Sequence, residues 1–346
     1  MKILIIRLTS MGDMIQVFPA ITDIIANYPN ASIDWLCDGQ FKEIPKIHPY
    51  IKKVFSIELR KIKKRQNIIK NMIKIKSVID EIKKQKYTHI IDIQSMFTKS
   101  GFLIPFMKSK SYGFDFYCST DKLNPLVLDF RYNTQHKAKK INLTIQSKML
   151  ASFACNYTYQ KKINYGLSTL SKNKKDSKTI IIHMGTTWKT KFWPFSHWLT
   201  LIELLLSKNY QVKLSWFGKE ELNSCLKIKK KFPSVVLMVN ENSKEYMPSS
   251  VSEKISEIIN CKALISVDTG IAHLASALHT KTIILYGPSP YKFCAALGKN
   301  TIHIRSSFKC NIKCKAKLCV INKKYAQCMN QINVDTVYTK IVEKTK

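Results

Sequence analysis

The chain has 346 residues, 45% of them hydrophobic, so it is long enough for two globular domains with sizeable cores. Its 57 Lys and Arg residues outnumber 23 Asp and Glu residues, and the formal net charge of +34 favours a polyanionic partner: nucleic acid, an anionic membrane or a phosphorylated substrate. No stretch approaches the roughly 20 apolar residues of a transmembrane helix, and the N-terminal segment lacks a signal-peptide cleavage site, so we expect a cytoplasmic protein.

The first half of the chain alternates short apolar runs with helical patterns, which is typical of a parallel α/β sheet. A strand at 2–8 ends in the turn TSMGD and is followed by one helix with the sequence MIQVFPAITDIIANY. Strands are then predicted at 32–38 and 53–59, a long Lys-rich helix ends near Lys86, and another strand follows. The sequence of that last strand is THIIDIQ, at 88–94.

A polar segment at 166–178 has no hydrophobic periodicity and is typical of a linker. A second alternating series follows it. Its strands are predicted at 179–185, 211–218, 235–239, 263–267, 282–287 and 301–305. Its helices are predicted at 196–209, 250–260 and 270–278, with a Lys-rich helix before 235 and a helical tail after 330. The pattern predicts two Rossmann-like, doubly wound domains that face a central cleft.

Asp13 follows Gly12 in the turn after the first strand. A carboxylate at the start of a helix stays ionised and can accept a proton from a sugar hydroxyl. The alternative is an aspartate that only caps the helix, and the spacing by itself favours this alternative.

A second motif, SVDTGIAH at 266–273, runs from a strand through a turn into a helix. Amides at that helix start, the Thr269 hydroxyl and His273 form a candidate phosphate cradle. His273 as a core histidine is an equally good interpretation. An aspartic protease is excluded because the chain has no second Asp-Thr-Gly or Asp-Ser-Gly motif.

Two further motifs follow strands of the second series. The segment GTTWKTKFWP at 185–194 offers small hydroxyls and lysines, which suit a departing diphosphate, although a charged surface loop has the same composition. The segment WFGKE at 216–220 places Glu220 where it can bind a sugar or ribose hydroxyl.

Together these motifs resemble glycosyltransferase family 9, the lipopolysaccharide heptosyltransferases. The opening MKILIIRLTSMGDMIQVFPAITD is similar to the N-terminal signature of the family, and THIIDIQSMFTKS is similar to its D-x-Q-G segment, with Ser95 in place of the usual Gly. Lys-x-Trp-Pro, Trp-x-Gly-x-Glu and SVDTGIAHLASAL then follow in the order of the family, so the resemblance spans residues 1 to about 290. The Ser-Met-Gly-Asp form resembles the branch that adds the first heptose.

The resemblance implies a GT-B fold and an inverting mechanism that needs no metal and no cofactor. It implies an acceptor-binding domain at 1–160, a linker at 161–178, a nucleotide-sugar-binding domain at 179–325 and a helical tail at 326–346. Asp13 and Lys191 are the implied catalytic residues. The implied nucleotide-sugar-binding residues are Thr186, Thr187, Lys191, Glu220, Asp268, Thr269, Gly270 and His273.

A basic run stands at 60–65, where similar proteins carry arginines that bind the acceptor. The candidate residues are Arg60, Lys61, Lys63 and Lys64. Arg guanidinium groups suit the carboxylates of Kdo and the phosphates of lipid A, although a solvated helix face is an equal alternative for each residue. We expect peripheral contact with the anionic cytoplasmic face of an inner membrane.

Four of the ten cysteines cluster near the C-terminus as Cys310, Cys314, Cys319 and Cys328. We interpret them as reduced thiols. A structural zinc or iron is the alternative, although the spacing differs from the common Cys-x2-Cys pairs.

The resemblance implies transfer of L-glycero-D-manno-heptose from ADP-heptose to a Kdo residue of Kdo2-lipid A. Another branch of the family, which adds the second heptose or glycosylates proteins, is the nearest alternative. A nucleic-acid-binding protein is the alternative of another class, but the chain has no recognisable nucleic-acid-binding motif, and we expect no specific nucleic-acid partner.

Overall fold

The computed structural model describes residues 1–59, 67–135, 140–171, 178–240, 247–308, 310, 319, 321 and 326–343. The chain divides into two compact units, Met1–Leu167 with Lys292–Cys294, and Ser168–Tyr291 with Ala295–Lys346. The division falls inside the predicted linker 161–178. Tyr165 and Leu167 are buried, so the first part of that segment is packed into unit 1.

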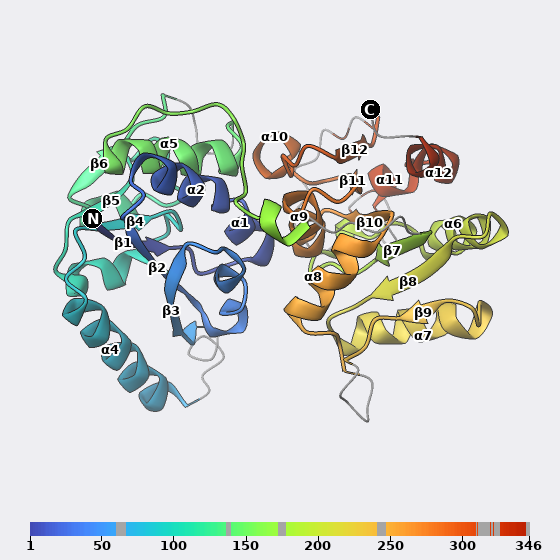
Figure 1. Ribbon diagram of the computed structural model, residues 1–346, viewed down its shortest axis with the longest axis horizontal. Coiled ribbons are helices and arrows are strands. Elements are labelled where there is room, and N and C mark those ends of the chain that lie inside the picture. The colour runs from blue at the N-terminus through green and yellow to red at the C-terminus, as the bar shows by residue number, and fades with distance from the viewer. Residues whose placement is uncertain are drawn as a thin grey trace. The chain divides into compact units, whose positions relative to one another are not determined.

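Unit 1 is built on a six-stranded parallel sheet with the order β3-β2-β1-β4-β5-β6 (Figure 1). Its strands are β1 (Lys2–Ile6), β2 (Ser32–Asp38), β3 (Ile51–Ile57), β4 (His89–Asp92), β5 (Ser111–Phe114) and β6 (Phe130–Tyr132). Its helices are α1 (Met11–Ile15), α2 (Phe18–Asn27), α4 (Ile68–Lys84) and α5 (Leu143–Cys155). The described part of unit 1 also contains short 3-10 helices: η1 (Gly39–Phe41), η2 (Pro45–Ile47), η3 (Gly101–Met107) and η4 (Asn124–Val127).

Alternation along β1 places apolar side chains on both faces of this sheet, as a buried parallel strand requires. Leu4 and Ile6 pack in a core with Ile75 and Ile79 of α4. On α2, Phe18 packs edge-on against Trp35 of β2, with 6.2 Å between the ring centroids.

The single helix predicted after β1 is wrong, because the chain forms two helices there. Pro19 stands in the first turn of α2, where its missing N–H leaves no unpaired donor. A proline at that position starts a helix well but cannot continue one from α1.

Unit 2 repeats the architecture with the order β12-β11-β10-β7-β8-β9, again entirely parallel (Figure 1). Its strands are β7 (Thr179–His183), β8 (Gln211–Ser215), β9 (Val236–Leu237), β10 (Ala263–Val267), β11 (Thr282–Tyr286) and β12 (Thr301–Arg305). Its helices are α6 (Phe195–Ser207), α7 (Lys219–Lys231), α8 (Val251–Asn260), α9 (Gly270–Ala277), α11 (Gln327–Asn330) and α12 (Val334–Val342). The short helices η5 (Ser168–Ser171) and η6 (Lys189–Lys191) also lie here, and α10 (Tyr291–Cys294) begins in unit 2.

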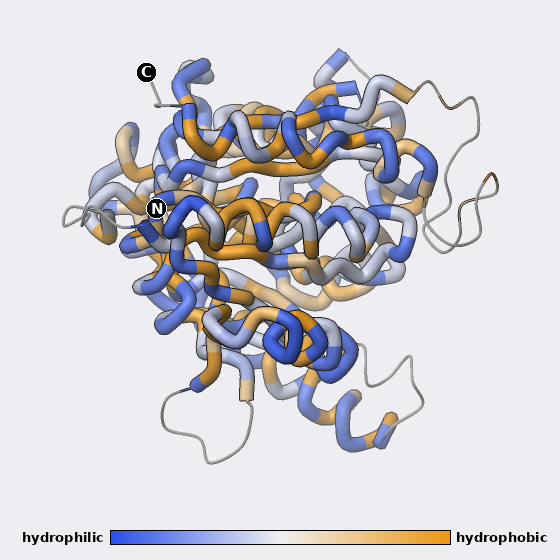
Figure 2. Tube along the Cα trace, turned by 90° about the vertical axis from the view of Figure 1, so that its right-hand side faces the viewer, coloured by the Kyte–Doolittle hydropathy of each residue, from blue (hydrophilic) through white to orange (hydrophobic). Residues whose placement is uncertain are grey.

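The C-terminal helices belong to the core of unit 2. Met329, Val337 and Ile341 are fully buried in the cluster that contains Trp198 of α6. The indole N–H of Trp193 donates to the carbonyl of Ile332 at 3.0 Å, which ties the tail to the segment before α6. Figure 2 shows the general pattern along the trace, with orange hydrophobic runs inside and blue hydrophilic stretches along outer turns. None of the described helices is long and apolar enough to cross a bilayer.

A buried ion pair joins the two helices on one face of the first sheet. Lys148 of α5 is fully buried, and its Nζ lies 3.2 Å from Oδ2 of Asp23 on α2. The Lys148 ammonium also donates to the carbonyl of Lys162. Burial raises the pKa of Asp23 even though Lys148 opposes the shift.

We expect Lys148→Met to lower the free energy of unfolding by about 3–5 kcal/mol at pH 7, because it leaves the Asp23 carboxylate buried without a cation. Urea denaturation followed by circular dichroism measures this change. At pH 5 the loss should be smaller, since a carboxyl whose folded pKa is raised is destabilising only above its unfolded pKa. The double variant Asp23→Leu, Lys148→Met should recover most of the stability. A double variant as unstable as the single one would contradict this interpretation.

Candidate functional site

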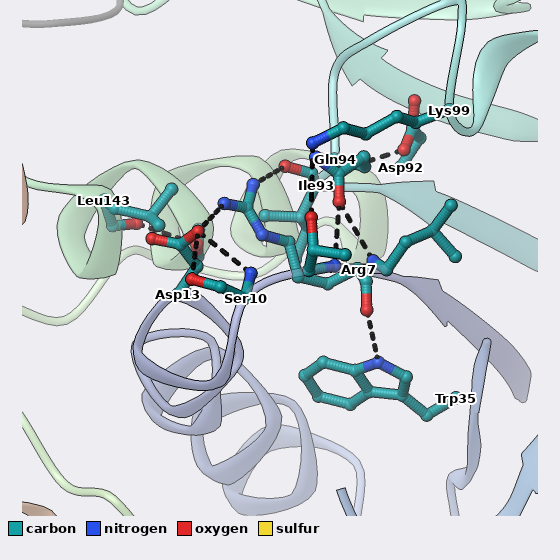
Figure 3. A network of polar contacts seen from close by, with 12 residues as sticks. Arg7, Ser10, Asp13, Trp35, Asp92, Ile93, Gln94, Lys99 and Leu143 are labelled. Carbon is teal, nitrogen blue, oxygen red and sulfur yellow. Dashed lines mark hydrogen bonds and ion pairs between the residues drawn. The ribbon is translucent and has the colours of Figure 1, made fainter. Parts of the chain in front are cut away.

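Asp13 lies at the carboxyl edge of the first sheet, in the short helix that follows β1. Three donors converge on its Oδ2: Nη2 of Arg7 at 2.9 Å, and the backbone N–H and hydroxyl of Ser10 at 3.1 and 3.2 Å (Figure 3). The Asp13 side chain is 33% exposed, so a substrate can reach it. The arrangement holds the carboxylate in place and caps α1. The capping interpretation is therefore confirmed, and the role as a base stays a prediction.

The turn that carries Asp13 is held by residues that follow β4. Oε1 of Gln94 accepts the backbone N–H groups of Leu8 and Thr9 at 3.0 and 3.2 Å, and Nζ of Lys99 donates to the Thr9 hydroxyl at 3.2 Å (Figure 3). Arg7 itself donates to the carbonyl of Ile93 at 2.8 Å. The position of Asp13 therefore depends on two neighbouring strands, β1 and β4.

Asp92, at the end of β4, holds in place the loop that follows this strand. It is fully buried and accepts hydrogen bonds from the backbone of Gln94 and from the side chains of Ser100 and Asn124. Burial raises the pKa of Asp92 to about 6, although these hydrogen bonds oppose the shift. Our sequence prediction did not select Asp92, Gln94 or Lys99 as site residues. The signal was the polar sequence DIQSMFTKS directly after a buried strand.

The second group of predicted residues lies around a cavity of about 730 Å3 in unit 2. Thr186, Thr187 and Glu220 line it, together with Trp193 and Trp198. This size is in the range of cofactor and nucleotide sites, which are mostly apolar with a few polar groups. The lining comes from loops at the carboxyl ends of β7 and β8, where parallel sheets bind ligands.

Lys191 and the motif after β10 come together in an ion-pair cluster. Nζ of Lys191 lies 2.6 Å from Oδ2 of Asp268, which also accepts the Ser289 hydroxyl at 2.6 Å. Nε2 of His273 lies 3.4 Å from Oδ1 of the same carboxylate. Burial would raise the pKa of Asp268, but the His273 hydrogen bond and the Lys191 charge outweigh it and lower that pKa well below its usual range. Asp268 therefore fixes the direction of the Lys191 ammonium.

Thr269 and Gly270 form the start of α9. Thr269 is the N-cap, and its hydroxyl lies 3.1 Å from that of Ser266. The first amides of a helix have no partner within the helix, so they are donors available to an anion. His273 is 4% exposed and its Nδ1 has no hydrogen-bond partner among the described residues.

The two glutamates at the start of α7 have different surroundings. Glu220 is exposed at the cavity, whereas Glu221 is half-buried and its Oε2 accepts the backbone N–H of Phe217 at 2.8 Å. Gly185 leaves room for Glu221, because a Cβ there would lie 2.0 Å from the Glu221 carboxyl carbon. The motif Trp-x-Gly-x-Glu ends at Glu220, so nothing in that motif indicated Glu221.

Other predicted residues lie outside the part of the chain that the structure describes. These are Arg60, Lys61, Lys63, Lys64 and Cys314. Among the described residues, no three His, Cys, Asp or Glu side chains come together as a metal site.

The sequence of this chain is similar to a known protein family and to several of its members. Residues 75–325 match the model of "Glycosyltransferase family 9 (heptosyltransferase)". The chain is 27% identical to lipopolysaccharide heptosyltransferase 1 of Pseudomonas aeruginosa over 323 residues, which cover 92% of this chain and 87% of the relative. It is 25% identical to lipopolysaccharide heptosyltransferase 1 of Escherichia coli K12 over 314 residues, 88% of this chain and 94% of the relative.

The solved structure of E. coli heptosyltransferase WaaC with ADP matches with a TM-score of 0.82 at 22% identity and covers 99% of both chains. This match and the two six-stranded parallel sheets confirm the predicted GT-B fold of two Rossmann-like domains.

Proposed function

Because the chain belongs to glycosyltransferase family 9, we propose that it transfers L-glycero-D-manno-heptose from ADP-heptose to a Kdo residue of Kdo2-lipid A. The relatives from Pseudomonas aeruginosa and Escherichia coli, which match over 92% and 88% of the chain, are both named lipopolysaccharide heptosyltransferase 1, and this supports the first heptose as the one transferred. The observation that carries the proposal is the accessible Asp13 carboxylate, held by Arg7 and Ser10 at a sheet edge.

In the proposed reaction Asp13 takes the proton from the attacking Kdo hydroxyl. The hydroxyl oxygen forms a bond to the anomeric carbon of heptose from the face opposite ADP, and the bond from that carbon to the diphosphate oxygen breaks. The configuration therefore inverts through an oxocarbenium-like transition state. ADP leaves with the electron pair of the broken bond.

Unit 2 supplies the groups for the nucleotide. The cavity lined by Thr186, Thr187 and Glu220 accommodates a nucleotide, and the amides at the start of α9 suit its diphosphate. Lys191 meets the negative charge that develops as ADP leaves. Asp268 and His273 hold Lys191 and the loop in position.

The direct test is incubation of the protein with ADP-heptose and Kdo2-lipid A, read by mass spectrometry. We expect a product heavier by one heptose residue. An acceptor that already carries the first heptose separates the alternatives, since the branch that adds the second heptose would extend only that molecule. Transfer to neither lipid would overturn the proposal.

The proposed reaction needs no divalent metal, because Lys191 and the α9 amides carry the charge of the diphosphate. We expect an excess of EDTA to leave turnover unchanged. A catalytic metal ion would lower the barrier by several kcal/mol, so its removal would be visible in the rate. The assay is turnover with and without the chelator. Inhibition that added Mg²⁺ reverses would contradict a metal-free mechanism.

The basic run at 60–65 supports an acceptor with carboxylates and phosphates on the cytoplasmic face of an inner membrane. We expect replacement of Arg60, Lys61, Lys63, Lys64 and Arg65 by Ser or Gln to raise KM for Kdo2-lipid A about tenfold or more, because each basic residue near an anionic surface contributes about 1 kcal/mol. KM for ADP-heptose should not change. Steady-state kinetics with each substrate varied measures both constants, and equal damage to the two would refute the acceptor role.

A further inference from the structure

A second cavity, distinct from the nucleotide cavity, lies in unit 1 between α4 and η3. Its volume is about 620 Å3. Apolar side chains form most of its lining, with Met72, Ile75 and Ile79 on the α4 side and Phe102 and Phe106 on the η3 side. We call it the α4 groove. Nothing in the proposed reaction uses it.

Large apolar side chains are exposed at and around this groove. Ile69, Met72 and Ile73 are 76%, 60% and 63% exposed on the first turns of α4, and Phe106 of η3 is 58% exposed. The spacing of 69, 72 and 73 places these three on one side of the helix. A cluster of exposed large apolar side chains beside a groove marks an interaction surface.

The charges of α4 are divided between its two halves. Its acidic residues, Asp80 and Glu81, lie in the second half and pair with Lys83 and Lys53 at 3.1 and 2.5 Å. The first half has the sequence IIKNMIKIK, with three lysines and no acidic residue. These lysines, Lys70, Lys74 and Lys76, are exposed and form no ion pair with any described residue. Apolar and cationic side chains therefore occur together at the same end of the helix.

The direction of α4 places this end on the side of the sheet that carries Asp13. Strand β3 ends at the carboxyl edge, α4 runs back along the sheet, and β4 starts again at the opposite edge. The first turns of α4 are therefore at the carboxyl edge. The turn that carries Asp13 follows β1 at the same edge.

We propose that the α4 groove binds an acyl chain of an anionic membrane lipid, with Ile69 and Ile73 inserted beside it into the membrane interface. This inference rests on the proposed function, since an enzyme with a lipid-linked acceptor must bind that acceptor at a membrane. The side chains themselves favour lipid. A helix with exposed apolar residues and a lysine-rich flank is typical of segments that lie in the interface of anionic bilayers. A protein partner would more often face a surface depleted of lysine.

The test is sedimentation with vesicles of phosphatidylglycerol and phosphatidylcholine at low salt. We expect the wild-type protein to pellet with these vesicles and much less with pure phosphatidylcholine. The double variant Ile69→Ser, Ile73→Ser should have a partition coefficient between vesicles and water that is about tenfold or more lower, because two apolar side chains no longer leave water. Both residues are mostly exposed, and serine has a helix propensity close to that of isoleucine, so the fold should be retained.

The matched control is Val236→Ser, Met247→Ser, which removes two apolar side chains that are 46% and 53% exposed in unit 2. We expect it to pellet like the wild type. Equal binding of the α4 variant and the wild type, or an equal loss in the control, would overturn the proposal. Self-association of the wild type in the absence of vesicles, abolished by the α4 variant, would also overturn it in favour of a second copy of the chain.

A second readout locates the acyl chain. In Met72→Trp the introduced indole is at the groove, so vesicles with bromine atoms on their acyl chains should quench its fluorescence. The same vesicles should not quench the indole that a Met247→Trp variant introduces. Equal quenching in both would overturn the groove as the site. Turnover of the wild type on an acyl-free Kdo disaccharide tests the proposed function by itself, because this acceptor has no acyl chain for the α4 groove to bind. If heptose is transferred to no acceptor but the vesicle results hold, the proposed function fails and the lipid site stands.

Discussion

Asp13→Asn is expected to lower turnover by about 10²–10⁴-fold, because the amide cannot take the proton from the attacking hydroxyl. The change is nearly isosteric and keeps an oxygen that can accept from Ser10. Affinity for ADP should stay close to that of the wild type, since the cavity that we propose for the nucleotide lies in unit 2. Single-turnover kinetics with ADP-heptose and isothermal titration with ADP measure the two effects.

Ser10→Ala is the matched control for the capping role of Asp13. It removes the hydroxyl that contacts the same carboxylate oxygen at 3.2 Å but leaves the carboxylate and its Arg7 partner in place. We expect a loss of stability of about 1 kcal/mol in this variant and only a small change in turnover. If Asp13→Asn behaves in the same way, with near-normal turnover and a modest loss of stability, Asp13 only caps α1 and is not the base.

The fold could be predicted where the sequence signal is local. The strands expected at 32–38, 263–267 and 301–305 have those bounds in the structure, as β2, β10 and β12. The clearest case is β10, an apolar run that is buried along its whole length between two neighbouring strands, as an interior strand of a parallel sheet requires. The signal was weak for β9, which has two residues instead of the predicted five, and Val236 within it is 46% exposed. At the edge of the sheet β9 pairs with β8 alone, over two residue pairs, so few contacts constrain its sequence.

The candidate site could be predicted only in part, because its contacts join distant segments. Asp13 was visible in its turn, but its environment depends on Gln94, and the Asp92 network includes Asn124, which is 32 residues away from Asp92. Lys191 and Asp268 are 77 residues apart, and neither motif by itself indicates an ion pair. Strand order determines these contacts: β10 lies beside β7, so the loops that follow them meet.

The exposed apolar side of α4 could not be predicted, because the sequence does not show which apolar residues of a helix are buried. The long helix was predicted from its length and its lysines, but its buried residues Asn71, Ile75, Ile79 and Ile82 follow one helical stripe. Met72 borders this stripe, whereas Ile69 and Ile73 lie farther round the helix, on its exposed side. Only the packing against η3 shows which of the apolar residues remain exposed.

Lys191→Ala is expected to lower turnover by about 10²–10³-fold, because the ammonium meets charge that develops only as ADP leaves. The geometry predicts that the loss has two parts. One is the missing cation, and the other is the Asp268 carboxylate, which keeps its negative charge beside the diphosphate once its partner at 2.6 Å is gone. Steady-state kinetics with ADP-heptose varied should show a fall in kcat larger than the rise in KM.

The two parts can be separated by a double-mutant cycle with Asp268→Asn. In the double variant no unpaired carboxylate remains, so we expect its turnover to exceed the product of the two single effects by about tenfold, a coupling of about 1.4 kcal/mol. Lys208→Ala, at the end of α6, is the control for loss of one positive charge and should leave turnover unchanged. Strictly multiplicative effects would show that Asp268 acts independently of Lys191, and an unchanged rate in Lys191→Ala would remove Lys191 from the mechanism.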